Sequence, residues 1–408
     1  MSSTVIFAGL LVILGHAFKV MFDKTRIPDV IPMVVIGLLV GPILGWITPS
    51  EFGIMGDLLN SLALSIVLFY SGLEIDMKII NRSLPTGIKL AIFNFLLTMI
   101  ITSIFSILVL KNSVIEALAI GAIIGGTSFA IVIPMANRLK IADESKTILL
   151  LESTFSDVFC IVISLGIFQM IKLREINPGF MIGQVISSFL ISSIVGAIGA
   201  FFWTMSLKWI RELENDMLLT PAFIIVIFGI TEFLGYSGAI SSLAFGIVSG
   251  NIKKILEYPA FSMFRNTSVM EFNKEELSIF SELVFILKVF FFFYLGLSIK
   301  MSNPLMALLG LLITVLILLS RLLSSKLMIK NSNISSYDKM TISAMGPRGL
   351  VPAILLSLAV KSNFNNIELL KDFVYSAILF SIIISAVIAF YIERGKFNLL
   401  LERIFPSK

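Results

Sequence analysis

Runs of apolar residues long enough to cross a bilayer recur along this chain from one end to the other. A helix needs about 20 such residues to span a hydrocarbon core of about 30 Å. Hydrophobic residues make up 57% of the chain and charged residues only 14%, whereas soluble domains carry about 25% charged residues. These patterns predict an all-α polytopic membrane protein without a soluble domain of useful size.

Thirteen segments are apolar enough to be spanning helices. They are residues 4–21, 28–47, 57–77, 86–110, 114–135, 147–171, 181–206, 217–234, 236–250, 277–299, 304–328, 341–360 and 370–393. The first segment has no basic residues before it and no obvious cleavage site after it, which favours a first helix over a signal peptide. We therefore expect a single transmembrane domain over residues 1–408, with no soluble regulatory domain.

Lysine and arginine are distributed very unevenly between the loops on the two sides of these segments. Of the 31 basic residues, 22 lie on the side that includes the C-terminus and 6 lie on the other side. Cytoplasmic loops carry the basic excess in membrane proteins. The distribution therefore predicts an outside N-terminus and a cytoplasmic C-terminus. We also expect the membrane to be a prokaryotic plasma membrane, although the loop charges do not identify it. The net charge of +5 is then a property of the loops, and binding to nucleic acid is not expected.

Two carboxylates fall inside the sixth segment, where an ionisable group is costly and marks a pathway or a pair. At 1.5 Å per residue, Asp157 lies about 16 Å past Lys146, near the bilayer midplane, and Glu152 lies closer to the cytoplasm. Ser153 shares a helix face with Asp157, whereas Glu152 points about 140° away. A carboxylate with a hydroxyl one turn away suits a small dehydrated cation, because hard cations take oxygen ligands.

Two basic residues inside other segments are candidate partners for these carboxylates. Arg321 lies about 8 Å from the cytoplasmic end of the eleventh segment, at the depth of Glu152. A buried pair of these two would satisfy both charges, and it either only holds two helices together or also serves transport. Lys288, near the middle of the tenth segment, either faces Asp157 as a proton-coupling partner or snorkels along a cavity wall or toward the interface.

Glycine and proline interrupt two of the segments. The fifth contains Gly125-Gly126-Thr127 and, further on, Pro134; the twelfth contains Gly346-Pro347-Arg348-Gly349. Ordinary use of these residues in membrane helices is one explanation, but a matched pair of interrupted segments points to a transporter site. We therefore expect two inverted-topology repeats, about 4–171 and 217–393, joined by a linker helix at about 181–206.

Several motifs carry a resemblance to a known family. They are Arg26-Ile27-Pro28 with Gly37 to Pro42 in the second segment, Phe69 to Asp76 in the third, Glu152 to Asp157 in the sixth, and Gly346 to Gly349 in the twelfth. The last two are similar to the NhaP-type signatures Glu-Ser-x-Phe-Asn-Asp and Gly-Pro-Arg-Gly. Over nearly its whole length, the chain resembles the monovalent cation:proton antiporter superfamily, which includes NhaP-type sodium/proton antiporters and Kef-type potassium systems.

The resemblance implies an antiporter fold, in which two interrupted helices cross inside a six-helix core. It also implies a homodimer in which each core moves against a scaffold. Asp157 would be the residue that binds the cation and carries the proton. Thr127 and Ser153 would be accessory ligands, and Glu74 would lie at the cytoplasmic approach to the site.

The chain departs from the family pattern at two positions. Ser156 stands where the family has Asn or Asp before the key aspartate. The NhaP-type Thr-Asp-Pro is replaced by residues 126–130, which are closer to the Kef-type Ser-Ser-Thr-Ala. The crossing therefore lacks an acidic group opposite Arg348, whose charge would instead offset the negative helix C-termini there. The resemblance also implies that the pair of Glu152 and Arg321 stabilises the core.

Together these features predict a secondary antiporter that exchanges Na⁺ or K⁺, with Li⁺ as a further candidate, for protons by alternating access. The proton and the cation would compete for Asp157, and a single carboxylate implies an electroneutral exchange of one for one. The alternative is a Kef-like gated potassium channel or efflux pathway. An enzyme is not expected, because His16 is the only histidine and no Ser/His pair or metal cluster accompanies it. The expected partners are the ions, membrane lipid and a second copy, with no cofactor.

Overall fold

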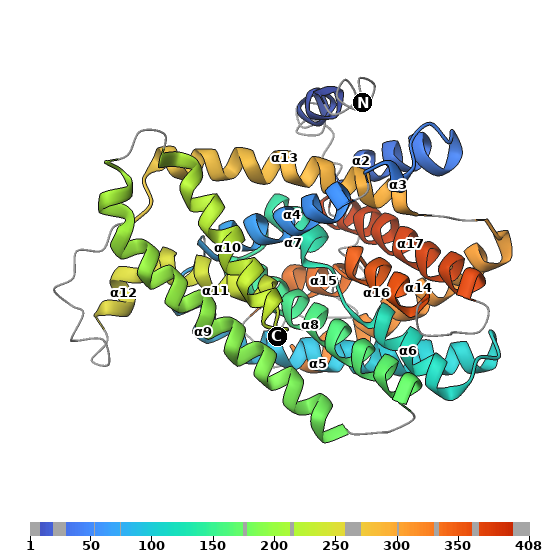
Figure 1. Ribbon diagram of the computed structural model, residues 1–408. Coiled ribbons are helices and arrows are strands. Elements are labelled where there is room, and N and C mark those ends of the chain that lie inside the picture. The colour runs from blue at the N-terminus through green and yellow to red at the C-terminus, as the bar shows by residue number, and fades with distance from the viewer. Residues whose placement is uncertain are drawn as a thin grey trace. The chain divides into compact units, whose positions relative to one another are not determined.

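The computed structural model describes residues 9–18, 30–52, 54–73, 75–173, 178–212, 216–257, 271–299, 302–329, 334–360 and 367–394. Within these ranges the chain is helical and contains no β-strand (Figure 1). The predicted all-α fold is therefore confirmed for the described part of the chain.

The helices match the thirteen predicted segments in order. They are Gly9–Phe18, α2 (Val30–Leu38) with the π-helical turn η1 (Leu39–Ile43), α3 (Pro49–Phe52), α4 (Ile54–Leu73), α5 (Met77–Leu108), α6 (Val114–Gly125), α7 (Phe129–Arg138), α8 (Asp143–Leu173), α9 (Pro178–Ile210), η2 (Asp216–Leu218), α10 (Leu219–Phe233), α11 (Gly238–Gly250), α12 (Ile252–Leu256), α13 (Lys274–Ser298), α14 (Pro304–Met328), α15 (Ser336–Ala344), α16 (Leu350–Val360) and α17 (Ile367–Glu393). The fifth and twelfth segments are each divided into two helices, α6 with α7 and α15 with α16.

Six of the described helices are long and apolar enough to cross a membrane, and six shorter apolar helices accompany them. Three helices exceed the predicted segments by about two helical turns, since α5, α8 and α9 contain 32, 31 and 33 residues. The reason is that hydropathy marks the hydrocarbon region, whereas the hydrogen bonds of a helix continue into the polar region. The second segment is also less regular than expected, because Pro42 lies inside a π-helical turn and lacks an N–H to donate.

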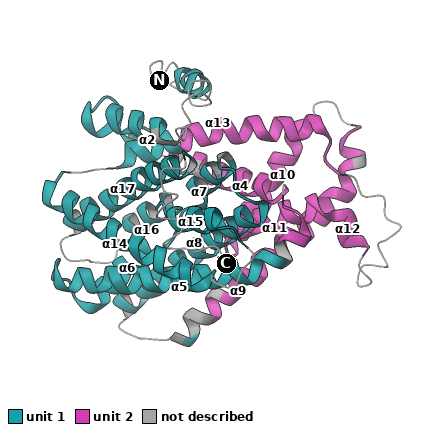
Figure 2. Cartoon of the chain, turned by 180° about the vertical axis from the view of Figure 1, so that it is seen from behind, with its two compact units in different colours: residues 1–51, 82–181, 292–408 teal, residues 52–81, 182–291 magenta. Residues whose placement is uncertain are grey.

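The chain divides into two compact units (Figure 2). Unit 1 comprises residues 1–51, 82–181 and 292–408, and unit 2 comprises residues 52–81 and 182–291. In unit 1, α6 and α7 pack against α8, and α14 packs against α15 and α17. In unit 2, α11 packs against α4 and α10. Unit 1 therefore contains both interrupted helices and the helix that carries Glu152 and Asp157.

Glycine allows close contact between helices in each unit, and one contact in unit 2 has a counterpart in unit 1. In unit 2, a Cβ on Gly246 of α11 would collide with the backbone of α4 beside Gly72. In unit 1, a Cβ on Gly37 of α2 would collide with the backbone of α13 beside Gly296. The two contacts are alike, because in each a glycine on one helix meets a helix that carries Phe-Tyr-x-Gly-Leu.

This second motif is an internal repeat that the sequence analysis missed. It occurs at residues 69–73 and again at residues 293–297, in the third segment and in the tenth. These are the third segments of the two expected repeats, if the seventh segment is the linker. The division into residues 4–171, 181–206 and 217–393 stays a prediction, and the repeated motif with its repeated contact supports it.

Candidate ion site at the helix crossing

Helix α8 carries two buried carboxylates whose surroundings differ completely. Glu152 is 0% exposed and Asp157 is 5% exposed. They are five residues apart, so their side chains leave the helix on different faces. Each therefore has its own set of neighbours, as the sequence analysis expected.

Both carboxylate oxygens of Glu152 accept hydrogen bonds from polar side chains. Both of its oxygens accept hydrogen bonds from Arg321 on α14, Oε1 from Nη1 at 2.8 Å and Oε2 from Nη2 at 2.7 Å. Asn94 on α5 donates its Nδ2 to Glu152 Oε1 at 3.3 Å, and Ser324 on α14 donates to the Asn94 amide oxygen. A bidentate pair of this kind satisfies two buried charges at once. Three helices, α5, α8 and α14, are joined through Glu152.

The two interrupted helices meet at their breaks. Helix α6 ends at Gly125 and α7 begins at Phe129, and the residues between them are extended. Helix α15 ends at Ala344 and α16 begins at Leu350. The backbone N–H of Ser128 in the first break donates to the carbonyl of Pro347 in the second at 2.9 Å. Each break thus provides a hydrogen-bond partner for a backbone group of the other, as irregular backbone within a membrane requires.

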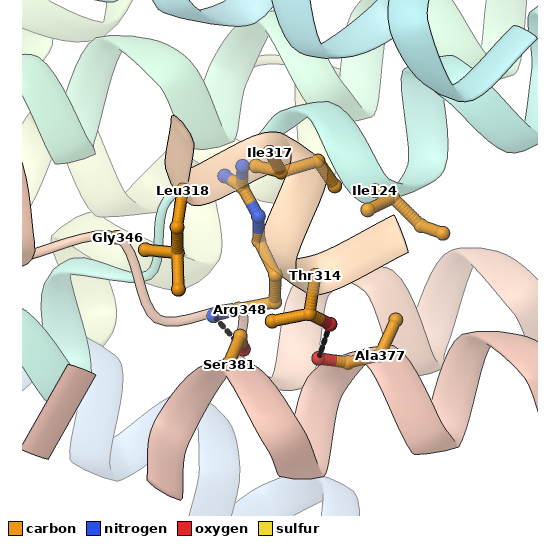
Figure 3. A pocket seen from close by; sticks show the side chains of 8 residues that line it. All are labelled: Ile124, Thr314, Ile317, Leu318, Gly346, Arg348, Ala377 and Ser381. Carbon is orange, nitrogen blue, oxygen red and sulfur yellow. Dashed lines mark hydrogen bonds between the residues drawn. The ribbon is translucent and has the colours of Figure 1, made fainter. Parts of the chain in front are cut away.

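A serine from the following helix caps each break. The N–H of Thr127 donates to Ser156 Oγ on α8 at 2.6 Å. The N–H of Arg348 donates to Ser381 Oγ on α17 at 2.8 Å (Figure 3). Both hydroxyls lie on the helix that follows the interrupted one in its own half of the chain. Ser156, which departs from the family pattern, therefore has a defined structural task here.

The Arg348 side chain extends from the second break to the first. Its Nη1 donates to the carbonyls of Gly126 at 2.6 Å and Gly125 at 3.2 Å, and to Thr127 Oγ1 at 3.1 Å. Its Nη2 donates to Thr98 Oγ1 on α5 at 3.3 Å. The two carbonyls belong to the C-terminal end of α6, which carries partial negative charge. Arg348 therefore offsets that charge, as the sequence analysis expected in the absence of a carboxylate.

A small pocket lies beside the second break (Figure 3). It is lined by Ile124, Thr314, Ile317, Leu318, Gly346, Arg348, Ala377 and Ser381. Thr314 donates to the carbonyls of Gly310 on its own helix and of Ala377 on α17. The lining of this pocket is mainly apolar, and neither of the two α8 carboxylates belongs to it.

Asp157 has the opposite surroundings to Glu152. Among the described residues, neither of its carboxylate oxygens accepts a hydrogen bond of ordinary geometry, although the side chain is buried and the backbone N–H of Phe129 at the start of α7 lies nearby. Gly126 of the first break lies beside it, since a Cβ built there would be 3.2 Å from Asp157 Oδ1. Cys160 borders the same point and donates its thiol to the carbonyls of Ala122 and Ile123. Asp157 thus presents its two oxygens next to extended backbone.

The other predicted site residues lie in different places. Ser153 is buried on α8 and donates its hydroxyl to the carbonyls of Leu149 and Leu150 on its own helix. Its oxygen lone pairs remain available to a ligand. Lys288 is half-buried on α13 in unit 2, and its two alternatives, pairing with Asp157 or snorkelling, both stay predictions. Glu74 lies outside the described residues.

Sequence reasoning missed four polar residues around the site. Asn94 and Thr98 on α5, Ser324 on α14 and Ser381 on α17 all donate to or accept from residues of the site. The amide of Asn94 was a usable signal, because an amide inside an apolar segment needs a partner. The hydroxyls gave no signal, because serine and threonine can bond to their own helix.

The sequence profile of the transmembrane part of sodium/hydrogen exchangers matches residues 9–392. The chain belongs to the sodium/hydrogen exchanger family. This confirms the expected membership of the monovalent cation:proton antiporter superfamily and the NhaP-type resemblance.

Two relatives and one solved structure illustrate this membership. The chain is 26% identical to Na(+)/H(+) antiporter 1 of Methanocaldococcus jannaschii over 374 residues, which cover 86% of this chain and 81% of the relative. It is 25% identical to K(+)/H(+) antiporter NhaP2 of Shewanella sp. (strain ANA-3) over 369 residues, which cover 87% of this chain and 61% of the relative. The solved structure of the sodium proton antiporter MjNhaP1 from M. jannaschii at pH 8 superposes with a TM-score of 0.71 at 22% identity, covering 100% of this chain and 99% of that one. The predicted antiporter fold is confirmed by this likeness.

Proposed function

We propose that this exchanger-family protein is a monovalent cation:proton antiporter in which Asp157 binds either a proton or the cation. The observation that carries the proposal is the contrast within one buried cluster. The charges of Glu152 and Arg321 are paired, and Arg348 bonds to helix carbonyls, while neither oxygen of Asp157 accepts a hydrogen bond of ordinary geometry from the described residues. A buried carboxylate without a partner is costly, and either a proton or a bound cation removes that cost.

The neighbours of Asp157 suit a small monovalent cation. Hard cations take oxygen ligands, and the carboxylate, the Ser153 hydroxyl and the extended backbone of the first break can supply them. Within the described residues, no three acidic, histidine or cysteine side chains gather as they do around a multivalent metal. A single carboxylate gives one proton per cation, so the exchange is electroneutral.

The proposed transport cycle uses the two units as separate parts. Unit 1 contains the crossing and both α8 carboxylates, so it would carry the loaded site, with either ion, across the membrane against unit 2. The family resemblance implies a homodimer, and the charge of the loops implies a cytoplasmic C-terminus; a prokaryotic plasma membrane stays an expectation. The two relatives are named for Na⁺ and for K⁺, so both ions are candidates and Li⁺ is a third.

The test is exchange by purified protein in proteoliposomes with a pH-sensitive dye inside. A proton gradient is imposed, and Na⁺, K⁺ or Li⁺ is then added outside. We expect at least one cation to dissipate the gradient without creating a membrane potential, and Asp157→Asn to reduce the exchange to the level of empty liposomes. Normal exchange by Asp157→Asn would contradict the assignment of Asp157 as the ion site. A membrane potential generated by the exchange would contradict the one-to-one stoichiometry.

The channel alternative makes a different prediction in the same liposomes. A gated potassium pathway would pass K⁺ without coupling to the proton gradient and would give single-channel currents in a planar bilayer. The two relatives described above are antiporters by name, and nothing in the comparisons supports the channel.

A further inference from the structure

The hydroxyl of Thr127 lies between two buried guanidinium groups. Its Oγ1 accepts a hydrogen bond from Arg348 Nη1 at 3.1 Å and another from Arg321 Nη1 at 3.3 Å. Thr127 is 1% exposed, and both arginines are 3% exposed. A hydroxyl oxygen has two acceptor lone pairs. Both lone pairs of Thr127 Oγ1 are therefore directed at positively charged donors.

Each of the two arginines has a second anchor on a different part of the site. Arg321 is held by Glu152 of α8, and Arg348 is held by the carbonyls at the C-terminal end of α6. The N–H of Thr127 is itself fixed by Ser156. Thr127 is thus the shared acceptor that links the ion pair on α8 and α14 to the arginine of the second break.

This arrangement conflicts with the role that the family resemblance implies for Thr127. A cation bound to Oγ1 would have to displace one of the two N–H donors and would then lie close to both guanidinium charges. Like charges at such short range repel strongly where little water screens them. Ser153 has no such conflict, because its hydroxyl donates to carbonyls of its own helix and its oxygen faces no cationic donor.

We propose that Thr127 is a positioning residue whose side chain joins Arg321 to Arg348 and does not bind the transported cation. The proposal rests on the proposed antiport through Asp157, and it specifies which of the two hydroxyls, Thr127 or Ser153, binds the cation beside Asp157. At a crossing without a carboxylate, Thr127 supplies Arg348 with an acceptor that adds no negative charge. The cation site then consists of Asp157 and Ser153 with backbone oxygens other than the Gly125 and Gly126 carbonyls, which already accept hydrogen bonds from Arg348.

The experiment compares Thr127→Val, Thr127→Ser and the control Thr154→Val. Valine keeps the shape of threonine and removes the acceptor, whereas serine keeps it. Thr154 is the matched control, because it is also buried and its hydroxyl only donates to the Leu150 carbonyl of its own helix. Each protein is measured for its thermal unfolding temperature in cation-free choline buffer, for its maximal exchange rate and for its half-saturating cation concentration.

We expect Thr127→Val to unfold at a clearly lower temperature in choline buffer and to exchange more slowly. Its half-saturating concentration should stay within about threefold of the parent, because no ground-state contact to the cation is lost. Thr127→Ser and Thr154→Val should behave like the parent. Failure of Thr127→Val to fold would also support the proposal, because a residue that only binds cation would leave the cation-free protein stable.

The opposite pattern would overturn the proposal. It consists of an unchanged unfolding temperature in choline buffer together with a tenfold or greater rise in the half-saturating concentration for Thr127→Val. The unfolding measurement requires no transport. A parent protein that exchanges nothing would therefore refute the proposed function, while the stability of Thr127→Val would still decide the structural link.

Discussion

Glu152 and Asp157 lie five residues apart on one helix, yet their surroundings have little in common. Glu152 accepts three hydrogen bonds from two other helices, whereas neither oxygen of Asp157 accepts a hydrogen bond of ordinary geometry from the described residues. Both are almost completely buried, so burial alone does not distinguish them. The difference teaches that a satisfied buried charge holds helices together, while an unsatisfied one is available to an ion.

Substitutions at the two carboxylates should therefore affect the stability of the fold differently. Removing one member of a buried ion pair leaves a charge without compensation, which costs about 3–5 kcal/mol of stability. Replacing Asp157 by the neutral Asn removes a charge that has no partner, so it should leave the fold intact while it abolishes exchange. The following variants test this division between stability and transport.

The largest effect on stability is expected from Arg321→Met. It leaves Glu152 buried without its guanidinium, so the free energy of unfolding in mixed micelles should fall by about 3–5 kcal/mol. The double variant Glu152→Gln with Arg321→Met is the control, because it removes both charges and should recover a large part of the loss. A single variant as stable as the parent would show that Glu152 is neutral or solvated, contrary to the bidentate pair.

A smaller loss is expected from Ser156→Ala, which removes the acceptor for the N–H of Thr127. An unsatisfied buried donor costs about 1–3 kcal/mol. Ser381→Ala removes the equivalent acceptor for Arg348 in the second half and should cost a similar amount. Thermal unfolding of both variants checks the comparison between the two breaks. A stable Ser156→Ala beside an unstable Ser381→Ala would mean that the two caps are not equivalent.

The smallest loss is expected from Asn94→Ala. Its hydrogen bond to Glu152 is long, at 3.3 Å, and Arg321 still holds both carboxylate oxygens. We expect a change of about 1 kcal/mol in the free energy of unfolding, with exchange retained at a reduced rate. An effect as large as that of Arg321→Met would show that the amide, and not the ion pair, secures Glu152.

Much of the fold could be predicted because a bilayer permits few solutions. Thirteen apolar segments and two interruptions by glycine and proline were sufficient to anticipate the helices and their breaks, whereas the crossing of the two broken helices was implied by the family resemblance. The helical period also separated Glu152 from Asp157, and equal depth selected Arg321 as the partner of Glu152. These inferences need only the rise and the period of a helix.

The remaining details depend on contacts that no local pattern reveals. The side chains that meet Arg348 come from α5 and from the break between α6 and α7, and nothing in their spacing marks Thr98 or Thr127 as its acceptors. The resemblance implied a ligand role for Thr127, which its two cationic donors argue against. The motif shared by residues 69–73 and 293–297 was visible in the sequence, but its meaning depends on the glycine contacts.

The central claim is that one carboxylate takes a proton or a cation but not both, and proton release on cation binding tests it most directly. Purified protein in weakly buffered detergent is mixed with NaCl or KCl while an indicator dye reports the pH, below the pH at which the site is already deprotonated. Because a ligand must lose its proton to bind a metal ion, we predict release of about one proton per chain, with more cation needed as the pH is lowered. Asp157→Asn should release none. Saturable cation binding without proton release, or equal release from Asp157→Asn, would contradict this account.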